Sequence, residues 1–210
     1  MYVVDRDFGF APNPFHGFCT LATCMPRIRA TAHVGDWVAG MGGARLRATG
    51  RCVYAMRVTE TKTFDDYWAS EAFFDKRPVR NGSSVMMVGD NIYRRDGSDG
   101  AWLQLDSHHS NPDGTPNGLN VYKDTRANQV LISRDFYYFG RSAPPVPPEV
   151  LSALRYKNGI GHRKFDSAGR DTFLEWFLKD HKADRNLVVG DPFDFEQTDR
   201  RYSGKGSKLL

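Results

Sequence analysis

The apolar and polar positions of this chain switch over short distances, which predicts several short strands before any long helix. The clearest pattern lies in Val34 to Thr63. There Asp36 to Gly40 is a short apolar run, and Arg51 to Thr59 is a second run that is rich in β-branched and aromatic residues. A glycine-bearing turn, residues 43 to 50, separates them. We expect this stretch to form the central hairpin of a sheet.

Other short apolar runs predict further strands, at residues 2–5, at 84–88 leading into 89–95, and at 101–106, 128–140 and 187–190. Helical spacing predicts a helix after Thr63, which is placed to cap it with Asp66 three residues later. Later helices are predicted over Glu149 to Lys157 and Ala168 to His181, and a short one within residues 19–32 is interrupted at Pro26.

Strands that mostly follow one another, with three or four helices beside them, indicate an α+β fold with an antiparallel, barrel-like sheet. We expect one domain over residues 1–195 and a polar, poorly ordered tail over 196–210. Residues 107–120, SHHSNPDGTPNGLN, consist almost wholly of turn-forming types and predict a mobile surface loop.

Composition narrows the class of protein. No apolar run approaches the roughly 18 to 20 residues that a membrane span requires, so no membrane association is expected. The first ten residues, MYVVDRDFGF, carry acids within their apolar run and lack a small-residue cleavage site, unlike a signal peptide. Three cysteines without a close pair argue against disulfides and against a thiolate zinc site. A cytoplasmic protein with reduced thiols is expected.

Positive charge is concentrated in one part of the chain. Six arginines lie between Arg27 and Arg57, against the single acid Asp36. Such an excess favours a polyanion such as nucleic acid, although a solvated arginine face would look the same. The arginines predicted to contact phosphates are Arg27, Arg29, Arg45 and Arg47. The last two would point to the same side if the chain there is extended.

Aromatic residues near these arginines suggest a pocket for a nucleobase. The loop from Phe8 to Phe18 carries four phenylalanines, which either pack into the core or line a cavity. Stacking on aromatic faces combined with a few polar groups is how proteins hold a flipped base. The predicted pocket residues are Phe15, Trp37, Asn91 and Asn13.

Two kinds of catalytic chemistry remain open. Asp90, Asp106 and His108 form a set that could hold a divalent metal or exchange a proton. A thiol nucleophile at Cys19 or Cys24 would need a base, for which His16 or His33 could serve. The motifs GxGxxG, GxxxxGK and GxSxG are all missing from the sequence, which disfavours dinucleotide, P-loop and esterase chemistry.

Several segments together resemble one family. They are YVVDRDFGFAPNPFHGFCTLATCMPRIRATAHVGDWVAGMG, RCVYAMRVTETKTFDDYW, VGDNIYRR, WLQLDSHHS and DFYYFG. Over residues 1 to 195 the chain is similar to the second type of nucleotide-modification-associated domains. That resemblance implies a context of DNA base modification in bacterial or phage systems. A looser similarity to PUA-like barrels, including the EVE and ASCH domains, rests on Gly35-Asp36 and on Val58-Thr59-Glu60, and it implies an aromatic pocket for a modified base.

The leading hypothesis is therefore a PUA-like mixed barrel that recognises a nucleotide or a modified base, in DNA by preference. It needs no cofactor and no bound metal. The first alternative is a metal-dependent enzyme that acts on DNA or nucleotides through Asp90, Asp106 and His108. The second is a protein-interaction module of a defence or modification operon.

Overall fold

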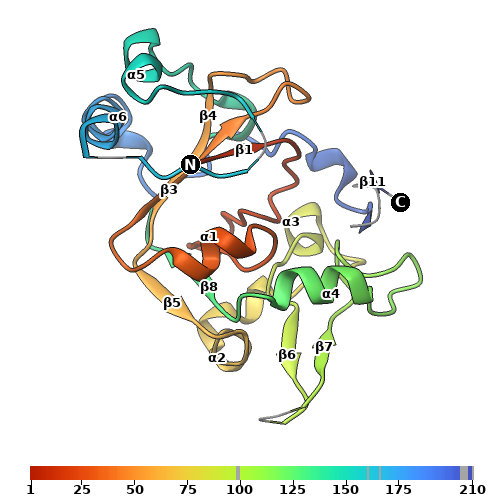
Figure 1. Ribbon diagram of the computed structural model, residues 1–210. Coiled ribbons are helices and arrows are strands. Elements are labelled where there is room, and N and C mark those ends of the chain that lie inside the picture. Colours follow the sequence, from red (N-terminus) through yellow and green to blue (C-terminus); the bar gives the residue numbers. More distant parts are fainter. Residues whose placement is uncertain (98–99, 160, 166, 204–207, 210) are drawn as a thin grey trace.

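The structure of the chain is a computed structural model that describes residues 1–97, 100–159, 161–165, 167–203 and 208–209. It is a mixed α+β fold in which short strands form several small sheets (Figure 1). The strands are β1 (Tyr2–Val4), β2 (Cys19–Leu21), β3 (Trp37–Gly42), β4 (Cys52–Arg57), β5 (Glu60–Lys62), β6 (Tyr93–Arg95), β7 (Trp102–Gln104), β8 (Val130–Ser133), β9 (Asp135–Tyr138), β10 (Tyr202–Ser203) and β11 (Lys208–Leu209).

The predicted central hairpin is confirmed. β3 and β4 pair in antiparallel fashion, with Trp37 opposite Arg57 and Gly40 opposite Tyr54. The sheet has the order β1-β3-β4-β9, and its edge strand β1 runs parallel to β3, so the sheet is mixed. A second, antiparallel sheet has the order β2-β8-β5, and β6 pairs with β7 as the expected hairpin. The pairings among the described strands leave these sheets open, and a PUA-like barrel stays a prediction.

The helices surround the sheets on several sides (Figure 1). They are α1 (Pro26–Thr31), α2 (Phe64–Ala69), α3 (Ser84–Met87), α4 (Gly118–Thr125), α5 (Pro148–Ala153) and α6 (Ser167–Asp180), with 3-10 turns at Glu71–Lys76, Gly140–Ser142, Lys182–Asp184 and Phe195–Gln197. α5 and α6 pack against the four-stranded sheet, where Val150, Phe173 and Phe177 enter its core. None of the helices in the described ranges has the length and apolar character of a membrane span.

Helix α2 begins as the sequence predicts. The Thr63 hydroxyl oxygen accepts a hydrogen bond from the Asp66 N–H at 3.1 Å, and the hydroxyl donates to the Asp66 carboxylate at 2.7 Å. This reciprocal capping satisfies a backbone donor that a helix start otherwise leaves open. The buried residues of the helix, Phe64 and Tyr67, pack in a second core together with Phe8 and Phe10 from the aromatic loop.

Several local predictions are wrong. Residues 19–21 form strand β2 and helix α1 begins at Pro26, so Pro26 starts a helix instead of interrupting one, and residues 187–190 form an isolated bridge, Val188 with Tyr138, instead of a strand. Residues 84–87 form helix α3 rather than a strand, because Ser83 accepts from the Met86 N–H and starts a turn. The stretch 107–120 is not a mobile surface loop, since residues 107–110 are buried and residues from 118 onward begin helix α4. Helix α5 ends at Ala153, because Arg155 takes a left-handed conformation with φ 45°.

The tail is tied to the rest of the chain in its described part. The Tyr202 N–H donates to the His108 carbonyl at 2.7 Å, and Arg80 donates to the carbonyl of Thr198 at 3.0 Å. The prediction of disorder at residues 204–207 and 210 lies outside the described residues. The boundary at residue 195 remains a prediction.

Asp7 makes the stability of the fold depend on pH. Its side chain is buried and accepts from the Tyr138 hydroxyl at 2.6 Å. Burial raises the pKa of this carboxyl to about 6, although the hydrogen bonds from Tyr138, Phe193 and Gly9 oppose the rise. Folding therefore favours the protonated form. The stability that this protonation contributes is present below pH 4 and is lost as the pH rises through 6.

We expect Asp7→Asn to remove a fall of about 2 kcal/mol in unfolding free energy between pH 4 and pH 7. Urea unfolding at both pH values measures the change. The matched control is Asp5→Asn, because Asp5 is exposed and two residues away. A fall of the same size in the parent and in Asp7→Asn would contradict the assignment.

Candidate functional site

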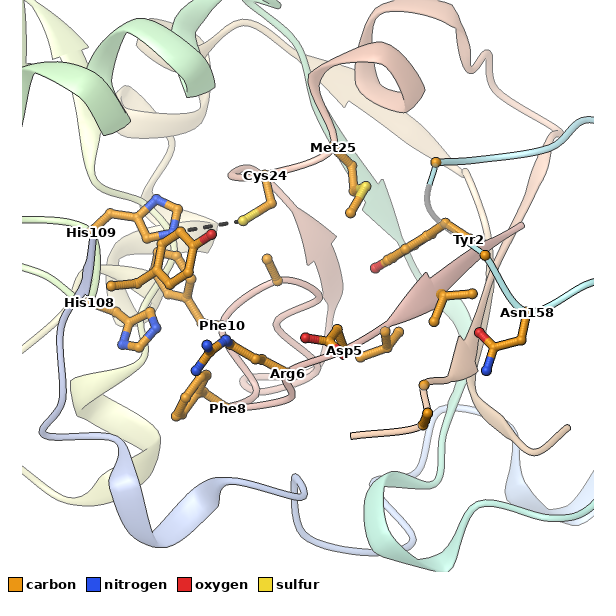
Figure 2. Close-up of a pocket in the computed structure, with 18 residues that line it drawn as sticks. Tyr2, Asp5, Arg6, Phe8, Phe10, Cys24, Met25, His108, His109 and Asn158 are labelled. Atoms are coloured by element: carbon orange, nitrogen blue, oxygen red, sulfur yellow. Dashed lines mark hydrogen bonds between the residues drawn. The ribbon is translucent and has the colours of Figure 1, made fainter. Parts of the chain in front are cut away.

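A cavity of about 790 Å³ opens beside strand β1. Its walls come from β1, the aromatic loop with Phe8 and Phe10, the start of α1, and the buried segment 107–110 (Figure 2). This volume lies within the range typical of small-ligand sites. Cys24 and His109 face each other at one side of the cavity, and Asn158 lies at the opposite side (Figure 2).

Cys24 is held in a tight turn just before helix α1. Cys24 and Met25 have φ values of 56° and 36°, a left-handed conformation that costs non-glycine residues roughly 1 kcal/mol or more each. The surroundings fix this turn from both sides. The Cys24 N–H donates to the Asp124 carboxylate at 2.9 Å, and its carbonyl accepts from the Arg29 Nε at 2.9 Å. The thiol therefore has a fixed position at the cavity wall.

His109 lies between this thiol and a buried carboxylate. Its Nε2 is 3.7 Å from the Cys24 Sγ, and its Nδ1 is 2.7 Å from the Asp124 Oδ2. Asp124 projects from helix α4 and also accepts from the Tyr93 hydroxyl at 2.8 Å. Cysteine, histidine and aspartate thus form a linear relay in which the carboxylate orients the imidazole toward the thiol, as in triads of covalent catalysis.

The charges in the relay support this role. Burial would lower the pKa of His109, but Asp124 and Cys24 outweigh it and raise that pKa to about 10. Burial would raise the pKa of Asp124, but His109 and Arg29 hold it below its ordinary value. The imidazole is therefore positive near neutral pH, and the aspartate is negative. Burial, followed by the neighbouring charge of His109, lowers the pKa of His108 to about 3, so His108 is neutral.

The tail forms part of the same wall. The Tyr202 ring stacks against His109 with centroids 5.6 Å apart, and its carbonyl accepts from the Asn120 side chain at 2.7 Å. Arg201 donates to the Asp106 carboxylate and, at 2.7 Å, to the Ser107 carbonyl. These contacts clamp the segment that carries His109.

Arg29 has a structural role instead of the predicted phosphate contact. Its side chain is fully buried and donates to the carbonyls of Cys24, Ala127, Gln129 and Asp124. The guanidinium also lies 5.4 Å from the Phe64 ring. Because a single side chain binds the backbone of both Cys24 and Asp124, it joins the two outer members of the relay.

The other predicted phosphate contacts are at the surface. Arg27 and Arg47 are exposed, and Arg45 lies 3.9 Å from the Asp194 carboxylate. Residues 44–47 form a turn in which Arg47 has φ 52°, so the chain is not extended there as the paired projection requires. Gly43 and Ala44, at the start of this turn, line the cavity. Phosphate binding by these three arginines remains a prediction.

The predicted base pocket is not assembled. Of the described residues that line the cavity, none is Phe15, Trp37, Asn13 or Asn91. Asn13 and Asn91 are buried and donate to the carbonyls of Val88 and of Tyr67 and Phe73. Phe15 stacks on Phe195, and Trp37 stacks on Tyr137. These residues support the fold, and the aromatic walls of the cavity come from others.

The predicted metal or acid-base set is also dispersed. Asp90 is buried against Tyr67 and Thr20, with hydrogen bonds of 2.8 and 2.6 Å. Asp106 pairs with Arg201, and the His108 Nδ1 lies 2.7 Å from the Arg200 carbonyl. Among the described residues, the group with metal-ligand spacing is Cys24, His109 and Asp124, whose ligand atoms lie within 4.8 Å of one another.

This group suits a relay better than a metal site. The thiol and the carboxylate approach opposite ring nitrogens of His109. A metal ion bound at the His109 Nε2 could also bind the Cys24 thiolate. Asp124 would then stay on the Nδ1 side as an orienting group, so the ion would have two direct ligands from this group instead of three.

The thiol hypothesis is the one that the structure develops. Cys19 and Cys52 are fully buried, whereas Cys24 lines the cavity. The imidazole that lies beside this thiol is that of His109, not that of His16 or His33, and the sequence did not point to Asp124. Cys24 is separated from His109 by 85 residues and from Asp124 by 100 residues, so no local spacing could reveal the relay.

Comparison with known proteins gives one family. The model of nucleotide modification associated domain 2 matches residues 1–199. No curated protein and no solved structure matches the chain. The match covers the cavity walls and the complete Cys24, His109 and Asp124 relay, and Tyr202 lies just beyond its end. The chain therefore belongs to the nucleotide modification associated domain 2 family.

Proposed function

We propose that this protein is an enzyme that modifies a nucleotide through a covalent bond to Cys24. The observation that carries the proposal is the relay itself: a thiol at the wall of a ligand-sized cavity, an imidazole 3.7 Å away and a carboxylate 2.7 Å beyond it. Three such groups in line, two of them buried, provide a nucleophile, a base and an orienting charge.

The relay supports a two-step reaction. The Cys24 sulfur attacks an electrophilic carbon of the substrate, forming an S–C bond while the thiol proton resides on the His109 Nε2. The bond from that carbon to its leaving group breaks, and His109 gives the proton to the leaving group. A hydroxyl nucleophile such as water then attacks the same carbon, its proton passes to His109, and the S–C bond breaks with its electron pair on sulfur, which releases the product and restores Cys24. Asp124 keeps its negative charge throughout and stabilises the imidazolium.

The walls of the cavity suit a planar ring. Tyr2, Phe8, Phe10 and Tyr202 line it. Phe10 lies 4.8 Å from the His109 ring, so aromatic surface continues up to the reactive group. Aromatic faces hold nucleobases by stacking. The family name supports a nucleotide-related substrate. We therefore propose a base in DNA or in a free nucleotide as the modified group, in the cytoplasm of a bacterial or phage-infected cell.

Selective alkylation tests the nucleophile. We expect iodoacetamide to label Cys24 in the native protein at least about tenfold faster than Cys19 or Cys52, because both of these are fully buried. Peptide mass spectrometry gives the rate at each site. Cys24→Ser should abolish the fast phase. Equal labelling of the three thiols, or a fast phase that survives the substitution, would refute the proposal.

A second candidate is recognition of a modified base without a reaction. The aromatic lining favours it, because stacking alone can hold a base. In that case a Cys24→Ala variant would bind nucleotides as the parent does, and prolonged incubation of the parent would leave every nucleotide or DNA probe chemically unchanged. The PUA-like barrel predicted from sequence belongs to this candidate.

A further inference from the structure

One segment at the cavity carries strong positive charge that the relay does not use. Residues 150–165 contain four Lys or Arg residues and one histidine, and no Asp or Glu. The basic loop is the part of this segment that follows α5, namely residues 155–159 and 161–165. Its cationic side chains are Arg155, Lys157, Arg163 and Lys164, and His162 lies among them.

The basic loop forms the side of the cavity opposite Cys24. Asn158, Gly159 and Gly161 line the cavity, and Figure 2 shows Asn158 far from the thiol. The loop is fixed in place at two points. The Arg163 N–H donates to the Met1 carbonyl at 2.9 Å, and the Asn158 side chain donates to the Thr49 hydroxyl at 3.1 Å.

The wall is open where the loop meets the cavity. Gly161 has φ 96°, and no atom lies within 4 Å of the position that its Cβ would occupy. Beside Gly159 the nearest atom to such a Cβ is the Arg163 Nη2, at 4.0 Å. A guanidinium therefore lies at the rim, next to backbone that a ligand can approach closely.

Like charges gather around this rim. Burial lowers the pKa of His162, and the Met1 amine, Arg27 and Lys164 lower it further, so each of these groups is within electrostatic reach of that imidazole. Asp5 is the one carboxylate among the described residues that line the cavity. Exposed cations held together with so little acid compensation form a site for an anion.

We infer that the basic loop binds a phosphate group of the substrate, while the base of the same substrate lies against the thiol. This inference rests on the proposed function for the identity of the reacting group. Phosphate is favoured over a carboxylate because its several oxygens accept from separate cations and backbone donors at once. The phosphate can belong to a free nucleotide or to a nucleic-acid strand.

Binding measurements on Cys24→Ala protein test the inference without turnover. The probes are the four 2′-deoxynucleoside 5′-monophosphates, their nucleosides and a single-stranded pentanucleotide. We expect each monophosphate that binds to do so at least about tenfold more tightly than its nucleoside, with an affinity that falls as salt rises. Tighter binding of the pentanucleotide than of any monophosphate assigns the phosphate to a strand, and the reverse assigns it to a free nucleotide.

Charge removal locates the site. Lys157→Ala with Arg163→Ala should reduce the preference for the monophosphate to less than about twofold. The matched control is Lys179→Ala with Lys182→Ala, two exposed cations that lie outside the basic loop. Circular dichroism checks that both double variants are folded.

Two results would overturn the inference: equal affinity for monophosphate and nucleoside, or equal loss in the loop variant and the control. Neither depends on the thiol. Phosphate-dependent binding without selective Cys24 labelling would refute the proposed function and leave this inference standing. Selective Cys24 labelling without a preference for phosphate would overturn this inference and leave the proposed function standing.

Discussion

Replacement of His109 by glutamine is expected to slow the alkylation of Cys24 by iodoacetamide at pH 7 by about 100-fold or more. The His109 Nε2 lies 3.7 Å from the sulfur, where it holds the thiol proton in the proposed reaction. Glutamine has a similar length but carries no charge. A competition assay with mass-spectrometric readout gives the ratio of the two rates.

His108→Gln is the matched control, because His108 is the adjacent residue and is also buried. Its Nδ1 lies 2.7 Å from the Arg200 carbonyl, and burial makes it neutral by lowering its pKa to about 3. Its loss should change the rate by less than about threefold. If the two variants slow alkylation to the same extent, the rate reports the packing of the segment, and His109 is not the base.

Replacement of Arg29 by methionine is expected to lower the free energy of unfolding by about 3 to 5 kcal/mol. The guanidinium is fully buried and donates to four backbone carbonyls. Methionine has a comparable length but leaves those acceptors without donors in a place that water does not reach. Urea unfolding followed by circular dichroism measures the loss.

Arg27→Met is the control, since Arg27 lies two residues earlier on the same helix and is exposed. Its effect should stay within about 0.5 kcal/mol. Arg29→Met should also slow Cys24 alkylation under conditions where the variant is folded, because the Cys24 carbonyl loses its donor. A stable Arg29→Met protein with normal alkylation would show that the arginine positions neither Cys24 nor Asp124.

The sequence predicted those parts of the fold that local patterns encode. The β3–β4 hairpin and the Thr63 cap follow from alternation and capping, which involve residues close in the chain. Residues 84–87 were mistaken for a strand because a short apolar run looks the same in a strand and in a helix. The segment 107–110 looked exposed because turn-forming residues are polar, yet here they are buried and paired with one another.

The site was less predictable for a physical reason. Cys24, His109 and Asp124 lie in three separate segments, which only the tertiary fold brings together. Sequence could name Cys24 as a possible nucleophile, but it offered His16 and His33 as bases because they are near in the chain. Arg29 looked like part of a surface patch, since charge density along a sequence does not reveal which cation is buried.

Tyr202 lies outside the part of the chain that the family model matches. The family match ends at residue 199, yet the ring that stacks on His109 comes three residues later. The aromatic surface beside His109 therefore comes in part from a residue that the family match does not cover, so the contacts that a ligand makes there are set by this chain's own last residues as well as by the matched domain.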